Sequence, residues 1–130
     1  RDDVELGRLL VVLQSLLHDQ QTTEFVIVSI PTGLAIAESE RLLLALRDEG
    51  IAVNNCVLNR LVSDDAADGY LGRLAKGQQD CVAELEELAG RCDVAVTQVP
   101  YFDVEVRSPY GLRAMGSALF DGGAAGQTQT

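Results

Sequence analysis

The chain has 130 residues, 47% of them hydrophobic, and a formal net charge of −10 from 20 acidic and 10 basic side chains. This length and apolar content suit one folded domain and exclude a wholly disordered chain. The acidic balance argues against a basic surface for nucleic acid. No apolar run approaches the roughly 18 residues of a membrane-spanning helix, so an integral membrane protein is not expected.

The first predicted element is a helix over residues 4–18, which has leucines at i, i+3, i+4 and i+7 spacing. Val11 and Val12 widen its apolar surface, so the helix is expected either to be nearly enclosed or to offer an apolar surface to another molecule. His18, in its last turn, is expected to meet the helix dipole rather than a metal. Arg1-Asp2-Asp3 resembles no signal peptide, which predicts a mature form, a fragment or an incomplete gene model.

A strand, a helix and a second strand are predicted next. Residues 24–30 are rich in β-branched side chains and do not alternate between polar and apolar, as in a strand covered on both faces, and Pro31 ends the run. Helical spacing from Leu34 to Leu46 predicts a helix with Gly50 at its C′ position. Residues 51–58 form the second predicted strand. The short links between these elements imply a parallel, right-handed crossover.

The second half of the chain continues the alternation. We predict a polar loop over 63–69, a helix over 70–90, a strand over 93–99 ended by Pro100, a helix over 110–120 and a disordered tail over 121–130. The fold class is therefore α/β, with at least three parallel strands and helices on both faces. The three cysteines, Cys56, Cys81 and Cys92, are expected to be reduced thiols in or near the core, which points to a reducing compartment.

Three loops follow the carboxyl ends of the predicted strands: Pro31-Thr32-Gly33, Asn59-Arg60 and residues 100–107. Ligands of open parallel sheets bind at such loops. The Asn59 amide offers a donor and an acceptor that match the edge of an adenine. Taken alone, however, the residue favours a simpler role as a loop cap.

Residues 23–59, "TEFVIVSIPTGLAIAESERLLLALRDEGIAVNNCVLN", resemble the ArsA family of ATPases. This family includes arsenite-pump ATPases and the Get-pathway ATPases that target tail-anchored membrane proteins. Residues 99–116, "VPYFDVEVRSPYGLRAMG", resemble a second family segment. The resemblance covers roughly residues 15–120 and is nearest to the chloroplast-type members. It implies that residues 1–120 are the C-terminal part of a P-loop NTPase domain of the SIMIBI type.

The resemblance also implies a set of nucleotide contacts. Asn59 matches an adenine-contacting Asn, and Thr32 stands where many members have a nucleotide-contacting Glu. Thr32 departs from the family pattern here, because a hydroxyl cannot replace that carboxylate as an anionic acceptor. The loop Pro100–Glu105 matches the segment that closes over the base, and its candidate residues are Pro100, Tyr101, Phe102 and Glu105.

Partner contacts are implied in the same way. Glu40 and Arg41 match a helix that meets membrane receptors in targeting members, although a solvated helix face explains them about as well. The helix over residues 4–18 matches a subdomain that grips hydrophobic clients, with Leu9 and Val12 as candidate contacts. An ordinary buried helix is the alternative for that segment. The complete protein is expected to be a homodimer.

Two motifs of the family are absent from these residues. Phosphate binding needs G-x-x-x-x-G-K-[ST], and the single lysine, Lys76, lies between alanine and glycine and cannot serve. ATP with Mg²⁺ is therefore expected only in the complete protein, and this chain alone is expected to be inactive. Residues 61–79 contain no Cys, so a zinc-bridged dimer is not expected.

The sequence is thus interpreted as part of an ATPase that targets tail-anchored proteins in the cytosol or the chloroplast stroma. Three alternatives stay open: an arsenite-pump ATPase subunit, a ParA- or MinD-like ATPase fragment, and a non-enzymatic α/β module that binds a partner through residues 6–17. The absence of an evident cysteine triad for a metalloid favours protein targeting over arsenite.

Overall fold

The computed structural model describes residues 1–62, 69–102 and 105–121. Its elements are, in chain order, α1 (Asp2–His18), β1 (Val26–Ser29), α2 (Gly33–Asp48), β2 (Asn55–Leu61), α3 (Tyr70–Cys92), β3 (Ala95–Pro100) and α4 (Pro109–Phe120). The predicted order of helices and strands is confirmed. The loop predicted over 63–69 and the tail predicted over 121–130 lie, except for Gly69 and Asp121, outside the described residues.

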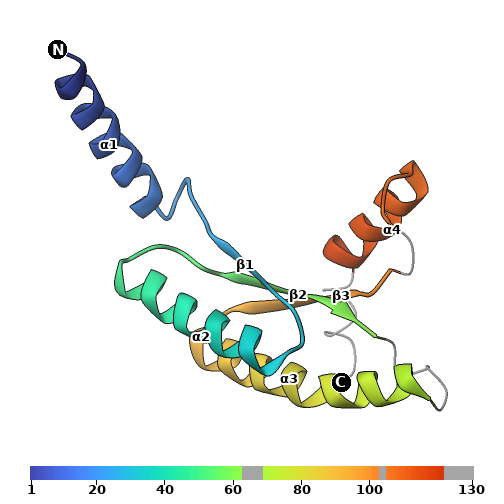
Figure 1. Cartoon of the computed structure of the whole chain (residues 1–130). Coiled ribbons are helices and arrows are strands. Elements are labelled where there is room, and N and C mark those ends of the chain that lie inside the picture. The colour runs from blue at the N-terminus through green and yellow to red at the C-terminus, as the bar shows by residue number, and fades with distance from the viewer. Residues whose placement is uncertain (63–68, 103–104, 122–130) are drawn as a thin grey trace.

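The three strands form one parallel sheet in the order β1-β2-β3. Helices α2 and α3 lie side by side on one face, whereas α4 lies on the other side next to β3 (Figure 1). The predicted α/β class, with a parallel sheet and helices on both faces, is confirmed. The carboxyl ends of the strands meet at one edge of the sheet, as the crossovers require.

The core lies between the sheet and the α2–α3 layer. Its largest side chains exposed by less than 2% are Ile36, Leu58, Leu85, Val53 and Val99. Helix α2 buries Ile36, Ser39 and Leu43, which share one face because they are three and four residues apart. The helix begins at Thr32, whose Oγ1 accepts a hydrogen bond from the Ala35 N–H at 3.3 Å.

The end of α2 confirms the predicted role of Gly50. Glu49 caps the helix and Gly50 follows with φ +73°, a backbone conformation that L side chains rarely adopt. The Gly50 N–H donates to the Arg47 carbonyl at 2.9 Å, which satisfies one of the last helical acceptors. The chain therefore turns here because glycine permits it.

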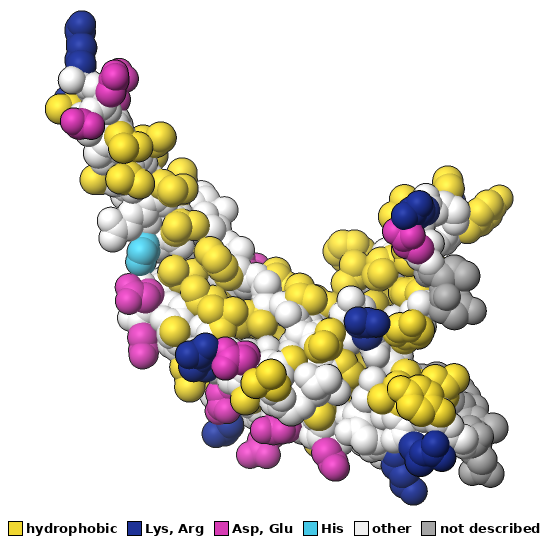
Figure 2. Space-filling model, in the orientation of Figure 1, with side chains coloured by type: hydrophobic (Ala, Val, Ile, Leu, Met, Phe, Trp, Pro, Cys, Tyr) yellow, Lys and Arg dark blue, Asp and Glu magenta, His cyan; other side chains and the backbone are white. Residues whose placement is uncertain are grey.

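Helix α1 projects away from the sheet and buries none of its residues (Figure 1). Five of its leucines are between 49% and 64% exposed: Leu6, Leu9, Leu10, Leu13 and Leu16. They lie on one stripe because their spacing follows the helical repeat, and Figure 2 shows hydrophobic side chains running along this helix. Of the two arrangements predicted for residues 4–18, the structure has the exposed one.

The cysteines are free, and they lie in or beside the core, as predicted. Cys56 is buried among core residues of the sheet and helices, and this burial raises the pKa of its thiol. The pKa of the Cys81 thiol is raised first by burial and then by the carboxylates of Glu84 and Asp80. Cys92 packs against the core cluster from the end of α3. Both raised pKa values favour the neutral, unreactive thiol.

Candidate functional site

A cavity of about 380 Å³ opens at the carboxyl edge of the sheet. It lies between the start of α2, the end of β2, the residue after β3 and the first turns of α3. Its lining residues are Ile30, Pro31, Thr32, Arg60, Val62, Tyr70, Leu71, Leu74, Gln78 and Tyr101. We call it the edge cavity. It lies where open parallel sheets bind ligands.

A β-bulge near the end of β2 shapes one wall of the edge cavity. Leu58 pairs with Gln98 and Leu61 with Pro100, so Asn59 and Arg60 together oppose the single residue between those two on β3. Arg60 has φ +66°, which is rare for a residue other than glycine. The Asn59 Oδ1 accepts a hydrogen bond from the Arg60 N–H at 2.9 Å. The bulge turns Arg60 toward the cavity.

Gln78 of α3 fixes this bulge from below. Its side chain is 7% exposed, and its Oε1 accepts from the Val62 N–H at 2.9 Å. Its Nε2 donates to the Arg60 carbonyl at 3.3 Å. One buried amide therefore satisfies backbone groups on both sides of Leu61, and removal of either bond would leave a buried polar group without that partner.

The Arg60 guanidinium lies over the Tyr101 ring, with 5.6 Å between its central carbon and the ring centroid. This geometry is a cation–π contact. The Tyr101 N–H donates to the Leu61 carbonyl at 2.8 Å, which extends the β2–β3 ladder past β3 and anchors the ring beside the bulge. Arg60 is the one charged side chain among the described residues that line the cavity.

The structure brings some of the predicted nucleotide residues together and separates others. Thr32 and Tyr101 both line the edge cavity, although the Thr32 hydroxyl is already used to cap α2. Asn59 does not line it: the side chain follows buried Leu58, and successive strand side chains point to opposite faces. Pro100 lines a second cavity of about 540 Å³ on the outer side of β3 and α3.

The rest of the predicted closing loop lies beyond β3. Phe102 is half-buried, whereas Glu105 is exposed and pairs with Arg107 at 2.7 Å. Asp103 and Val104, which connect them, lie outside the described residues. The predicted closure over a base therefore stays a prediction.

Gln78 was not among the site residues predicted from the sequence, and Arg60 was predicted only as the neighbour of Asn59 in the loop after the second strand. A signal for Gln78 was present, because it follows Ala75 by three residues and precedes Leu85 by seven, on the apolar face of α3. A polar side chain at such a position is expected to have a specific buried partner. Nothing in the sequence marks the bulge that makes this partner the backbone of Arg60 and Val62.

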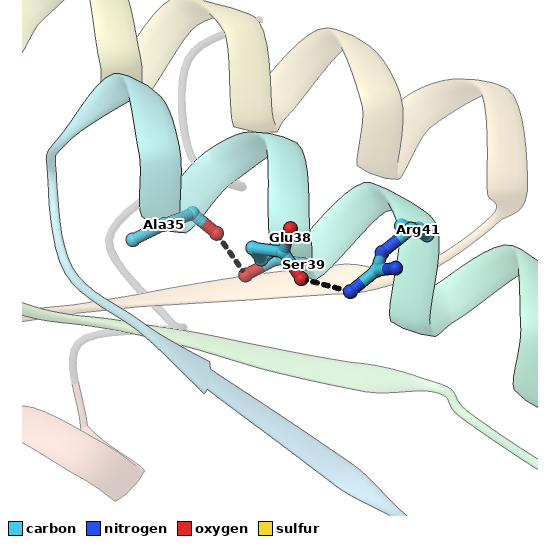
Figure 3. Close-up of polar contacts among 4 residues, drawn as sticks. All are labelled: Ala35, Glu38, Ser39 and Arg41. Carbon is cyan, nitrogen blue, oxygen red and sulfur yellow. Dashed lines mark hydrogen bonds and ion pairs between the residues drawn. The ribbon is translucent and has the colours of Figure 1, made fainter.

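The predicted partner-binding residues lie on exposed surfaces. Arg41 pairs with Glu38 at 2.5 Å along α2 (Figure 3), and Glu40 accepts from Arg91 of α3 at 3.5 Å. The Arg41 side chain is 78% exposed and the Glu40 side chain 42% exposed, so a partner could reach both residues. Leu9 and Val12 are exposed on α1 at 64% and 56%.

The side chains of the edge cavity suit a flat, largely apolar ring rather than a metal ion. No carboxylate, thiol or imidazole belongs to its described lining, and such groups are the ligands that Mg²⁺ and Zn²⁺ require. In residues 1–62, 69–102 and 105–121, no cluster of three or more His, Cys, Asp or Glu side chains is placed to hold a metal. The described helices include none with the length and apolar character to cross a membrane.

Comparisons with known proteins fit this architecture. Residues 7–121 match the ArsA_ATPase family, described as anion-transporting ATPase. The chain is 37% identical to ATPase ARSA1 of Chlamydomonas reinhardtii over 110 residues, which cover 82% of the chain and 14% of that protein. It is 30% identical to ATPase GET3B of Arabidopsis thaliana over 120 residues, or 89% of the chain, and 34% identical to ATPase GET3C over 112 residues, or 83%. These matches span 28% of each Arabidopsis protein, so the chain corresponds to a minor part of its relatives' length.

Proposed function

Because the chain belongs to the ArsA family of anion-transporting ATPases, we propose that it is the C-terminal part of a nucleotide-binding domain. In this proposal it supplies the base end of the ATP site of a longer protein. One observation carries the proposal: the ends of three parallel strands bring Thr32, Arg60 and Tyr101 to a single cavity. A flat base fits its mostly apolar walls, and the few polar groups would orient it.

In the proposal, this chain contacts the base, and the rest of the complete protein binds the phosphates and the metal. ATP hydrolysis in the complete protein requires Mg²⁺ and a phosphate-binding loop, and the residues described have neither fitting carboxylates at the cavity nor a P-loop lysine. In the proposal, Thr32 and Tyr101 hold the base from the wall of the edge cavity. Asn59, whose side chain lies outside that lining and accepts from the Arg60 N–H, would have to turn toward the base to contact it. Pro100, Phe102 and Glu105 belong to the loop that excludes water from it.

The outer edge of β1 supports the idea that a longer protein completes the sheet. Among the described residues, no strand pairs with this edge. Val26 and Val28 are 51% and 64% exposed, and β1 contains no proline, lysine or other charge that would protect an edge. A cavity of about 700 Å³ runs between β1 and α2, beside the Glu38–Arg41 pair of Figure 3. A further strand and its connections would cover both surfaces.

For the complete protein we propose the targeting of tail-anchored membrane proteins by a homodimer that opens and closes with ATP turnover. The exposed leucine stripe of α1 supports this because it offers an apolar surface to a hydrophobic client segment. Glu40 and Arg41 are the proposed contacts for a membrane receptor. An arsenite-pump subunit is the second candidate, on the strength of the family description.

The proposal is tested by ligand titration of the 130-residue chain, followed by NMR of tyrosine ring protons. Tyr70 and Tyr101 line the edge cavity, whereas Tyr110 is 84% exposed on α4 and serves as an internal reference. We expect adenosine and ATP to shift the first two with similar, weak affinities on the order of 1 mM, because only the base end is present. Failure of adenosine to bind, or ATP turnover by the chain above that of a heat-denatured sample, would contradict the proposal.

A further inference from the structure

We propose that Arg60 is the base-stacking residue of this site and that Gln78 is its positioning residue. The inference rests on the proposed nucleotide site. In it, the guanidinium plane is backed on one side by the Tyr101 ring and offers its other side to a purine ring. Arg60 thereby supplies a contact that the family resemblance does not predict, since the resemblance points to Asn59 and to the loop after β3.

The backbone of Arg60 is the first argument. At φ +66° it adopts a conformation that glycine accommodates without strain, and here an arginine occupies it inside a strand. Such strain persists only where surrounding contacts enforce it, and it is concentrated at functional sites. Packing does not explain why an arginine occupies this position, because Arg60 is exposed and is not part of the core.

The contacts that enforce the strain form the second argument. Gln78, with 7% of its surface exposed, holds the Arg60 carbonyl at 3.3 Å and the Val62 N–H at 2.9 Å. A third bond, from the Arg60 N–H to Asn59 Oδ1 at 2.9 Å, fixes the other side of the residue. The Arg60 N–H, the Arg60 carbonyl and the Val62 N–H are therefore all hydrogen-bonded. The Arg60 backbone is pre-organised, so a ligand need not order it when it binds.

The surroundings of the guanidinium decide which ligand it suits. It lies 5.6 Å from the Tyr101 ring centroid, with Leu71 and Leu74 among the other lining residues. A guanidinium that lies over one aromatic ring can also stack on a second planar system, and aromatic bases have such a face. A phosphate would instead be bound through several converging donors. Around the cavity, the Thr32 hydroxyl accepts from the Ala35 N–H and the Gln78 amide bonds the backbone through both its oxygen and its nitrogen, so Arg60 is the one charged donor among the described lining residues.

The test compares three ligands on the wild-type chain and on variants. Adenosine carries the base, ribose 5-phosphate carries only the sugar and phosphate, and guanosine probes base selectivity. We expect Arg60→Lys, which keeps the charge but loses the plane, to weaken adenosine binding about tenfold. Gln78→Leu, which removes both hydrogen bonds, should weaken it to a similar extent. Gln78→Glu keeps only the acceptor for Val62 and should fall between wild type and Gln78→Leu.

Arg91→Lys is the matched control, because Arg91 is an exposed arginine roughly 30 Å along α3 from Tyr70. It should bind adenosine like wild type. The spectroscopic signature is an upfield shift of the Arg60 side-chain protons, which stack directly against the added base. This shift should be lost in Gln78→Leu if Gln78 positions Arg60, and ribose 5-phosphate, which has no aromatic ring, should not produce it. If Gln78→Leu does not fold, Arg60→Lys and Gln78→Glu carry the test.

The outcomes separate this inference from the proposed function. If wild type binds no adenosine, the nucleotide site itself is wrong. If wild type binds adenosine and the Arg60 and Gln78 variants bind it equally well, the site stands and the stacking role is wrong. If ribose 5-phosphate binds as tightly as adenosine and loses affinity in Arg60→Gln but not in Arg60→Lys, Arg60 is a phosphate contact and the inference is overturned.

Discussion

The hydroxyl oxygens of Ser29 and Ser39 lie 2.8 Å apart beneath the sheet, where the two residues are 4% and 8% exposed. Ser39 Oγ also lies 2.7 Å from the Ala35 carbonyl oxygen (Figure 3), which can only accept. The single Ser39 proton therefore goes to Ala35, and Ser29 donates to Ser39. This chain of two hydrogen bonds ties the end of β1 to the second turn of α2.

Its direction predicts unequal costs for two similar substitutions. Ser39→Ala leaves the buried Ser29 hydroxyl without its acceptor and should lower the free energy of unfolding by about 1–3 kcal/mol. Ser29→Ala leaves Ser39 still donating to Ala35 and should cost less than about 1 kcal/mol. Urea denaturation of both variants and of the double variant measures the coupling. Equal costs for the single variants would show that the assigned direction is wrong.

Glycine-to-alanine substitutions should have opposite signs at two positions. Gly50 has φ +73° and open space where a Cβ would lie, so Gly50→Ala should destabilise through backbone strain alone, by about 1 kcal/mol. Gly77 lies in the interior of α3 with equally open space, so Gly77→Ala should stabilise by about 0.5–1 kcal/mol. Thermal denaturation of the two variants checks this. A stabilising Gly50→Ala would contradict the C′ assignment.

The buried thiol of Cys56 predicts a loss of stability at alkaline pH. Burial raises its pKa in the folded chain, so on raising the pH the unfolded chain loses this proton first. The neutral thiol's contribution to the free energy of unfolding is fully present below the ordinary thiol pKa of about 8.5. It is lost as the pH rises through the raised pKa of the folded chain. Urea midpoints at pH 7.5 and 9.5 should differ less in Cys56→Ala than in wild type. Identical differences would remove Cys56 as a cause.

Asn59 is predicted to read the adenine edge in the complete protein. Asn59→Ala there should weaken ATP binding by about 1–3 kcal/mol, the cost of an orphaned polar group. Asn55→Ala is a matched control on the same strand, since Asn55 lies at the amino end of β2 and bonds Glu24 at 2.7 Å. Isothermal titration of both variants decides between the roles. Unchanged ATP affinity and unchanged stability in Asn59→Ala would make Asn59 a strand-end cap.

The exposed surface of α1 is predicted to capture hydrophobic clients. In the complete protein, Leu9→Ser and Val12→Ser should lower the yield of a client's apolar segment in a pull-down while ATP binding stays intact. Val11 lies roughly 160° around the helix from Leu9, opposite the leucine stripe, so Val11→Ser is the control and should capture clients normally. Unfolding of the Leu9 and Val12 variants, with normal capture by the folded fraction, would show that α1 is an ordinary buried helix in the complete protein.

The sequence alone was sufficient for the elements of the fold. Residues 24–30 read as a strand and Leu34–Leu46 as a helix because apolar periodicity is a local property. Gly50 marked a helix end because only glycine readily adopts positive φ. The family and the absence of a phosphate-binding lysine could also be predicted from the sequence, since both depend on residue identity in short segments.

Tertiary structure alone decided which of the candidate residues meet. The one-residue bulge after Leu58 leaves Asn59 off the edge cavity and turns Arg60 into it, and a register shift of this kind has no signature in the sequence. Gln78 bonds Arg60, which lies 18 residues earlier in the sequence, because of the position at which α3 packs along β2. Likewise, the spacing of the α1 leucines is the same whether the helix is enclosed or free. Burial depends on what a surface meets, and that is a property of the assembled chain rather than of its residue order.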